Sequence, residues 1–189
     1  LTVYVLFIRC VQYLQDCQIL SAQGITSDEL SQHFDLLLRA LVAFPDNTLL
    51  ATTLFEFLAL VADRKAVRER SSKTEDGELV SCVARALEGH RQDRSIQRAG
   101  LQLYEAILNN ATEKSQKAFA KKIFRAVGEN LQRNNDDPAI CYTSYSILCT
   151  LTDKMGDKLA PWVERILGLI LGTIAQQFSA ELVAKCLLL

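Results

Sequence analysis

The stretch that decides the fold is 93–107, which reads DRSIQRAGLQLYEAI. Two other stretches have the same form: DNTLLATTLFEFLAL at 46–60 and DPAICYTSYSILCTL at 137–151. Each begins with an aspartate, a residue that caps helices by accepting hydrogen bonds from exposed backbone N–H groups. Apolar residues then recur every three or four positions, which indicates one buried helical face. The starts at 46, 93 and 137 are 47 and 44 residues apart, so the sequence predicts one helix repeated three times.

Matching offsets in the three helices carry similar side chains. A small residue stands at the same offset in each, as Thr53, Gly100 and Ser144. Large apolar residues stand at four other shared offsets. In order along the helices, these sets are Leu49, Ile96 and Ile140; Leu54, Leu101 and Tyr145; Phe57, Tyr104 and Leu148; and Leu60, Ile107 and Leu151. A repeated small residue lets a neighbouring helix approach closely, as stacked units require. We therefore expect Gly100 and Leu101 to lie at a packed junction between neighbouring repeats.

The composition favours helices throughout. The 189 residues are 49% hydrophobic and include only three prolines and eight glycines, a balance that favours helices over a turn-rich sheet. Helix breakers separate the apolar-periodic segments, and no interval between them is long enough for a linker. We therefore predict an all-α chain that forms a single segment over 1–189.

One part of the chain resembles a complete armadillo repeat. The segment 62–67 would be its short first helix, 77–87 its second helix, and 93–110 its long third helix. The spacing of the three starts also fits the period of roughly 40–47 residues found in HEAT and armadillo repeats. The resemblance implies a right-handed α-solenoid of stacked helical hairpins or triplets, whose third helices line a concave binding groove. The expected repeats, about four in number, are 25–63, 64–110 and 111–154, with partial repeats at 1–24 and 155–189.

The residues offer little for catalysis or for a metal ion. His33 and His90 have no partner histidine at helical spacing, and the chain has no glycine-rich phosphate loop. The pair Asp136 and Asp137 precedes Pro138 and is typical of a helix start. Six cysteines show no C-x-x-C pair, and they are Cys10, Cys17, Cys82, Cys141, Cys149 and Cys186. Such a pattern indicates buried thiols in a reducing compartment. We predict no enzyme, no cofactor, no metal and an intracellular location, cytoplasmic or nuclear.

The two apolar ends predict a chain cut from a longer one. The start at 1–8 is followed by Arg9 and Gln12, which do not form a signal-peptide cleavage site. The apolar stretch 166–175 is too short to span a bilayer, so we expect no membrane association. Terminal repeats need a polar outer face, and both ends lack one. We expect them to contact further chain segments or another subunit.

The expected groove lacks the residues that armadillo proteins use to hold nuclear-import peptides. Third helices in that group carry a Trp and, four residues later, an Asn that grips the ligand backbone. The matching positions are Phe55 and Ala59, Gln102 and Ala106, and Ser146 and Thr150, so none keeps the pair. A folded surface or a helix is therefore the expected ligand. The exposed candidates for partner binding are Phe55, Arg94, Arg98, Gln102, Tyr142 and Ser146.

Charge is unevenly distributed although the net charge is −1. The range 64–125 holds fourteen Lys and Arg residues against eight Asp and Glu residues. Lys114, Lys117, Lys121 and Arg125 follow helical spacing and predict a basic stripe on one helix. A solvated helix face explains this stripe, and an acidic protein surface or helix would fit it as a partner. The sequence thus favours a protein–protein interaction scaffold. It leaves open a HEAT-type factor associated with nucleic acid or nucleoprotein, and an isolated helical bundle with a regulatory role.

Overall fold

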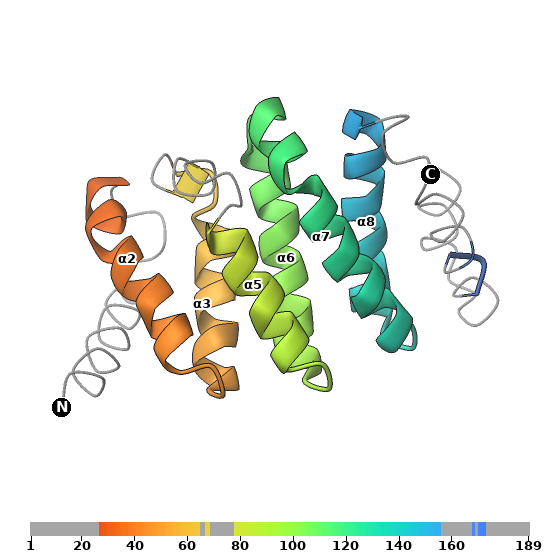
Figure 1. Cartoon of the computed structure of the whole chain (residues 1–189), viewed down its shortest axis with the longest axis horizontal. Helices are drawn as coiled ribbons and strands as arrows, with labels where there is room; N and C mark the ends of the chain where they lie inside the picture. The colour runs from red at the N-terminus through yellow and green to blue at the C-terminus, as the bar shows by residue number, and fades with distance from the viewer. Residues whose placement is uncertain (1–26, 65–66, 69–77, 156–167, 169, 173–189) are drawn as a thin grey trace.

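The computed structural model describes residues 27–64, 67–68, 78–155, 168 and 170–172. Six helices span most of this part, and it contains no strand, so the predicted all-α class is confirmed for these residues (Figure 1). The helices are α2 (Ser27–Ala43), α3 (Thr48–Leu60), α5 (Glu78–Gly89), α6 (Arg94–Asn110), α7 (Glu113–Arg133) and α8 (Pro138–Met155).

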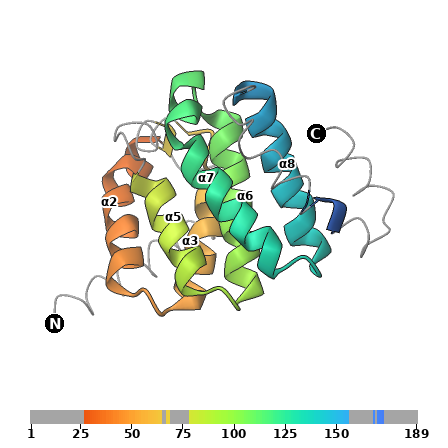
Figure 2. The ribbon, with the colours of Figure 1, turned by 45° about the vertical axis from the view of Figure 1, so that its right-hand side comes forward.

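The helices form three hairpins, α2–α3, α5–α6 and α7–α8, arranged in two layers. Figure 1 shows α2, α5 and α7 on the near side and α3, α6 and α8 behind them, and Figure 2 shows the same helices turned by 45°. In the rear layer α6 packs against both α3 and α8, and in the front layer α5 packs against both α2 and α7. Every extensive helix contact therefore joins helices of one hairpin or of two hairpins consecutive in sequence.

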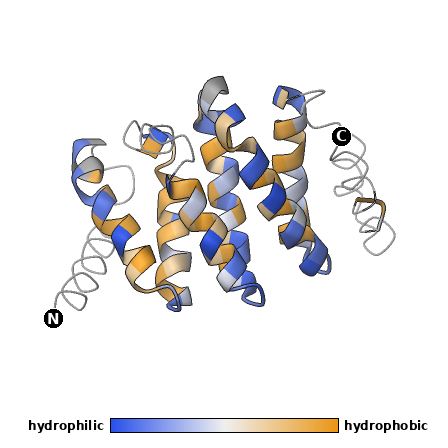
Figure 3. Ribbon diagram, in the orientation of Figure 1, coloured by the Kyte–Doolittle hydropathy of each residue, from blue (hydrophilic) through white to orange (hydrophobic). Residues whose placement is uncertain are grey.

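The buried core lies between the layers and continues from one hairpin to the next. Its largest fully buried side chains include Phe34 on α2, Phe55 on α3, Tyr104 on α6, Phe119 on α7 and Tyr145 on α8. The Tyr104 hydroxyl donates a hydrogen bond to the Val80 carbonyl oxygen at 3.1 Å, which ties α6 to α5. Hydrophilic residues gather at the three turns along the lower edge (Figure 3). The apolar periodicity of the helices thus produces one continuous core.

Polar side chains cap the rear-layer helices at this lower edge. Asp93 accepts hydrogen bonds from the backbone N–H groups of Ser95 and Ile96 at the start of α6. Asp137 caps α8 in the same way, and both caps confirm the sequence-based prediction. The expected cap Asp46 is wrong by one residue, because Asn47 accepts the hydrogen bond from the Leu50 N–H at the start of α3. Asp46 instead lies in the turn after Pro45.

This shift of one residue corrects the predicted repeat in α3. Leu49 and Leu60 are 77% and 71% exposed, whereas they were expected to match the buried Ile96 and Ile107. Counting from Asn47 instead, the buried counterparts in α3 are Leu50, Leu54, Phe55, Leu58 and Val61. The match between α6 and α8 stands as predicted. Leu54 therefore occupies the offset of Gly100 and Ser144, so a small residue is not repeated in all three helices.

The close approach at Gly100 lies within one hairpin. A Cβ atom added at Gly100 would lie 2.6 Å from Leu87 Cδ2 on α5. Both residues belong to the α5–α6 hairpin, so the expectation of a contact between neighbouring repeats is wrong for Gly100. Leu101 is fully buried, as expected. The absence of a side chain at Gly100 thus allows α6 to pack closely against α5.

Two helical glycines offer a matched stability test. Gly128→Ala is expected to raise the free energy of unfolding by about 0.5–1 kcal/mol, because alanine favours helix and nothing lies within 4 Å of the added Cβ. Gly100→Ala should gain less than this, or lose stability, because Leu87 must move. Chemical denaturation measures both, and Leu87→Ala should restore the gain at Gly100. Equal gains at both glycines in the wild-type background would contradict the close contact.

Candidate functional site

Five of the six predicted partner-binding residues lie on two adjacent helices of the rear layer. Arg94, Arg98 and Gln102 are exposed and stand four residues apart along α6. Tyr142 is 37% exposed on α8, and Ser146 is half-buried one turn later. Because α6 and α8 pack directly against each other, these residues form one surface, here called the rear face.

Polar contacts between α6 and α8 fix the position of these side chains. Ser146 donates a hydrogen bond to the carboxylate of Glu105. Arg98 donates to Asp137 Oδ2 from its Nε at 3.0 Å and from a terminal nitrogen at 2.6 Å. Arg94 donates to Asp136 at 2.5 Å. The two arginines therefore join the second hairpin to the third while they remain about half exposed to solvent.

Phe55 is the exception among the predicted residues, and its expected exposure is wrong. Its side chain is fully buried. The cap at Asn47 shifts the register of α3 by one residue from the predicted alignment, so Phe55 faces the core. The exposed counterpart of Gln102 and Ser146 is Glu56. Asparagine caps helices as well as aspartate does, so a comparison of both start positions could have found Glu56. The residue four positions after Glu56 is Leu60, so α3 still lacks the Trp and Asn pair.

Asp137 pairs with Arg98 from a buried position. Its side chain is only 1% exposed. Burial alone would raise the pKa of this carboxyl group, but the hydrogen bonds from Arg98 and from the backbone N–H groups of Ile140 and Ala139 outweigh that effect. The net result is a pKa below the ordinary value. The ionised form thus holds α6 against α8 and caps α8 at the same time.

Asp137→Asn is expected to cost about 1–3 kcal/mol at neutral pH, because a charged hydrogen bond at a buried position is lost. A lowered pKa in the folded state stabilises the protein above the unfolded pKa of about 3.9, and this stabilisation is lost as pH falls through the folded pKa. The difference between the wild type and Asp137→Asn in denaturation curves should therefore shrink below about pH 4. Asp136→Asn is the control, since Asp136 is 60% exposed and its pairing should contribute little. A pH-independent difference would contradict this role.

A buried amide network lies behind the lower edge of the rear face. The Gln97 side-chain amide donates to the carbonyl oxygens of Leu87 and His90, both at 2.8 Å. Asn130 on α7 donates to Gln97 Oε1 at 2.5 Å, and Asn134 donates to Asn130 Oδ1 at 2.9 Å. The network connects the end of α5, the start of α6 and the last turn of α7. Amides in amphipathic helices usually face solvent, so no local sequence pattern predicts this network.

The basic stripe on α7 is present but is partly engaged within the chain. Lys117, Lys121 and Arg125 are exposed at helical spacing, whereas the side chain of Lys114 lies outside the described residues. Arg125 forms an ion pair with Glu129 at 2.9 Å. The stripe therefore offers fewer uncompensated charges than the sequence pattern predicts.

The structure shows the surroundings of the carboxylate pair and of three cysteines noted in the sequence. Asp137, half of the carboxylate pair noted in the sequence, caps α8. Within the described ranges no group of three or more His, Cys, Asp or Glu side chains could hold a metal ion. Cys82 and Cys141 are buried free thiols, Cys149 is a half-buried one, and the other three cysteines fall outside those ranges. Of the helices described here, none has the length and apolar character needed to cross a bilayer.

Comparison with protein-family models, with curated proteins and with solved structures finds no match to this chain. The resemblance to an armadillo unit therefore rests on the sequence pattern over 62–110.

Proposed function

We propose that this chain is a protein–protein interaction scaffold, built as a right-handed α-solenoid of the armadillo/HEAT type, whose rear face binds a protein partner. The observation that carries the proposal is the alignment of equivalent positions in α3, α6 and α8. Glu56, Gln102 and Ser146 occupy the same offset from their helix caps, in three helices that pack side by side. Stacked repeats create extended surfaces of this kind, and such surfaces bind other proteins.

The side chains of the rear face suit a protein ligand. Tyrosine and arginine are enriched at the energetically important positions of protein interfaces, and the face presents Tyr142 beside Arg94 and Arg98. The ion pairs with Asp136 and Asp137 hold both arginines in place, so less side-chain entropy is lost on binding. Leu49 and Leu60 add exposed apolar area on α3. The face therefore combines fixed polar groups with apolar contact area.

Photo-crosslinking in cells tests this proposal directly. A benzophenone amino acid replaces Gln102 on the rear face or, as a matched control, the exposed Gln132 on α7. We expect irradiation to give a discrete crosslinked protein from position 102 that position 132 does not give. Arg94→Glu combined with Tyr142→Ala should remove this product while circular dichroism stays unchanged. Identical products from both positions would reject the rear face as the binding surface.

The alternative function is association with nucleic acid or nucleoprotein through the basic stripe, and it is favoured by the charge of α7, which holds six basic and two acidic residues. We expect only weak binding of duplex DNA at low ionic strength, lost near about 150 mM salt, where the Debye length is about 8 Å. If about four cations hold the DNA, the logarithm of the binding constant should fall with the logarithm of the salt concentration, with a slope of roughly −0.9 for each phosphate neutralised. Fluorescence anisotropy over a salt series measures this. Sub-micromolar affinity retained at about 150 mM salt would favour the nucleic-acid function instead.

A further inference from the structure

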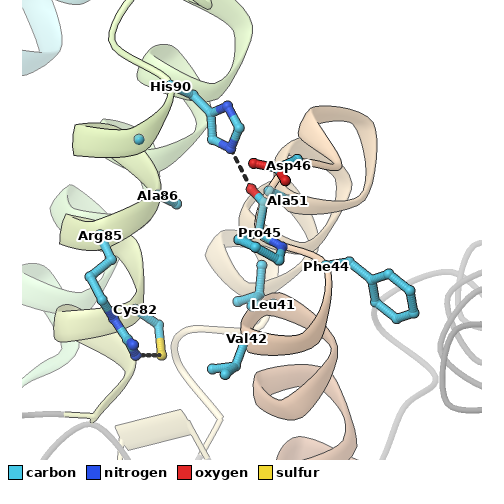
Figure 4. A pocket seen from close by; sticks show the side chains of 11 residues that line it. Leu41, Val42, Phe44, Pro45, Asp46, Ala51, Cys82, Arg85, Ala86 and His90 are labelled. Atoms are coloured by element: carbon cyan, nitrogen blue, oxygen red, sulfur yellow. Dashed lines mark hydrogen bonds between the residues drawn. The ribbon is translucent and has the colours of Figure 1, made fainter. Parts of the chain in front are cut away.

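A small pocket lies between the first two hairpins, away from the rear face. It has a volume of about 160 Å³ and is formed by the end of α2, the α2–α3 turn and α5 (Figure 4). Leu41, Val42 and Ala51 form one apolar wall, and Ala86 lies on the opposite side. The His90 side chain donates a hydrogen bond to the Pro45 carbonyl oxygen at 2.5 Å and bridges the two sides at one end.

The pocket has the size and lining for one apolar side chain. A cavity of about 150 Å³ lined by apolar residues can hold benzene, so this volume fits a phenyl ring. It is well below the roughly 300–1,000 Å³ typical of pockets for whole small molecules. Val42 is 56% exposed, so apolar surface extends from the pocket to the solvent. Pockets that accept a single anchor side chain are typical of protein interfaces.

Positive charge lies at the other end of the pocket and continues onto α7. Arg85 lines the pocket there and donates to Cys82 Sγ at 3.4 Å. Ser81, one turn before Arg85, accepts a hydrogen bond from Lys122 of α7 at 2.8 Å. Lys121 and Arg125 lie within one turn of Lys122. Lys122 therefore places one cation of α7 against the turn of α5 that precedes Arg85.

Two acidic side chains on this surface lie toward the lower turns, and Glu78 lies at the other end of α5, in its first turn. Glu88 forms ion pairs with Arg91 and Arg133, and Glu129 forms ion pairs with Arg125 and Arg133. Each of these two carboxylates is thus shared by two arginines. Asp46 is the acidic residue that lines the pocket, and it stands at the end closed by His90. The surface between Arg85 and α7 consequently favours a negatively charged ligand.

We infer that the pocket between α2 and α5 binds an acidic peptide segment of a protein partner, with one phenyl-sized apolar side chain in the pocket and adjacent carboxylates on Arg85 and the α7 cations. This surface is separate from the rear face and does not depend on the proposed function. The apolar anchor supplies affinity, and the basic surface supplies orientation and a faster encounter.

A pair of fluorescein-labelled peptides tests this inference on the full chain. Both are short runs of glutamate and aspartate, and one has a central phenylalanine where the other has alanine. In fluorescence anisotropy we expect the phenylalanine peptide to bind about tenfold more tightly, as burial of the ring predicts. Arg85→Glu should weaken its binding by about tenfold. Lys154→Glu, the same change of charge at an exposed position near the end of α8, should change it by less than about twofold.

Two pocket variants separate the anchor from general charge attraction. Ala86→Phe fills the pocket, and Val42→Asp places a charge at its exposed mouth. Each should make the two peptides bind equally, because the phenylalanine no longer has a site. Val42→Asp changes an exposed side chain, so it keeps the test valid if Ala86→Phe unfolds the protein. Equal binding of both peptides by the wild type would overturn the inference, as would equal losses from Arg85→Glu and Lys154→Glu.

Discussion

Leu101→Ala is expected to lower the free energy of unfolding by about 2–5 kcal/mol. Leu101 is fully buried in α6, the helix that packs against both α3 and α8. Truncation removes apolar surface from the core and leaves a cavity that rigid neighbouring helices cannot fill. Because α6 contacts both other hairpins, the loss affects the packing of the whole described domain.

Chemical denaturation of Leu101→Ala beside Gln102→Ala measures this effect. Gln102 is the next residue and is exposed, so its truncation should change stability by less than about 0.5 kcal/mol. Leucine and glutamine have nearly the same helix propensity. The difference between the two losses of stability therefore reports the burial of Leu101. Similar small losses in both variants would show that α6 is rotated relative to the structure described here.

Gln97→Ala is expected to cost about 3 kcal/mol, although the residue is polar. Its side chain is 1% exposed and bonds to three groups: the buried carbonyl oxygen of Leu87, the partly buried carbonyl oxygen of His90 and the buried amide of Asn130. Each group left without a hydrogen bond in the core costs about 1–3 kcal/mol. Water can enter the space left by the side chain and form some of the lost hydrogen bonds. The total cost for the three groups is therefore expected near the lower end of the range that these single costs give.

Gln132→Ala is the matched control, because Gln132 is helical and exposed on α7. A double variant with Asn130→Ala adds a sharper test. Since Gln97 and Asn130 bond to each other, their losses should not add, and the double variant should be more stable than the sum predicts. Additive losses, or a loss at Gln97 no larger than that at Gln132, would contradict the network.

The sequence predicted the helices well because their signals are local. Asp93 and Asp137 cap α6 and α8 as expected, and the apolar offsets shared by these two helices are buried in both. The error in α3 arose where two adjacent residues, Asp46 and Asn47, could both serve as the cap. Both residue types cap helices well, so the sequence offers two registers for α3, and a comparison of both was needed to find the one in the structure.

The sequence predicted the part of the candidate site that depends on local signals and missed the part that depends on contacts between helices. The apolar residues of α6 occupy its buried face, so its opposite face is predicted to be exposed. That face carries Arg94, Arg98 and Gln102. Their pairing with Asp136 and Asp137 depends on how α8 packs against α6, across about forty residues of sequence. The pocket between α2 and α5 likewise joins residues of two hairpins. The expected partial repeats at 1–24 and 155–189 fall largely outside the described residues and stay predictions.

The distance between α3 and α8 tests most directly the account of three equivalent hairpins stacked in order. Leu49, Ser95 and Ala139 stand two residues after the caps of α3, α6 and α8, and all three are exposed. Spin labels introduced as unnatural amino acids leave the native cysteines intact, and electron paramagnetic resonance measures their separation. Neighbouring helix axes lie about 8–10 Å apart, so the backbone separation should be about 8–10 Å between positions 49 and 95 and about 16–20 Å between 49 and 139. A closed bundle would bring α3 and α8 together, and a separation near 10 Å between 49 and 139 would contradict the stacked arrangement.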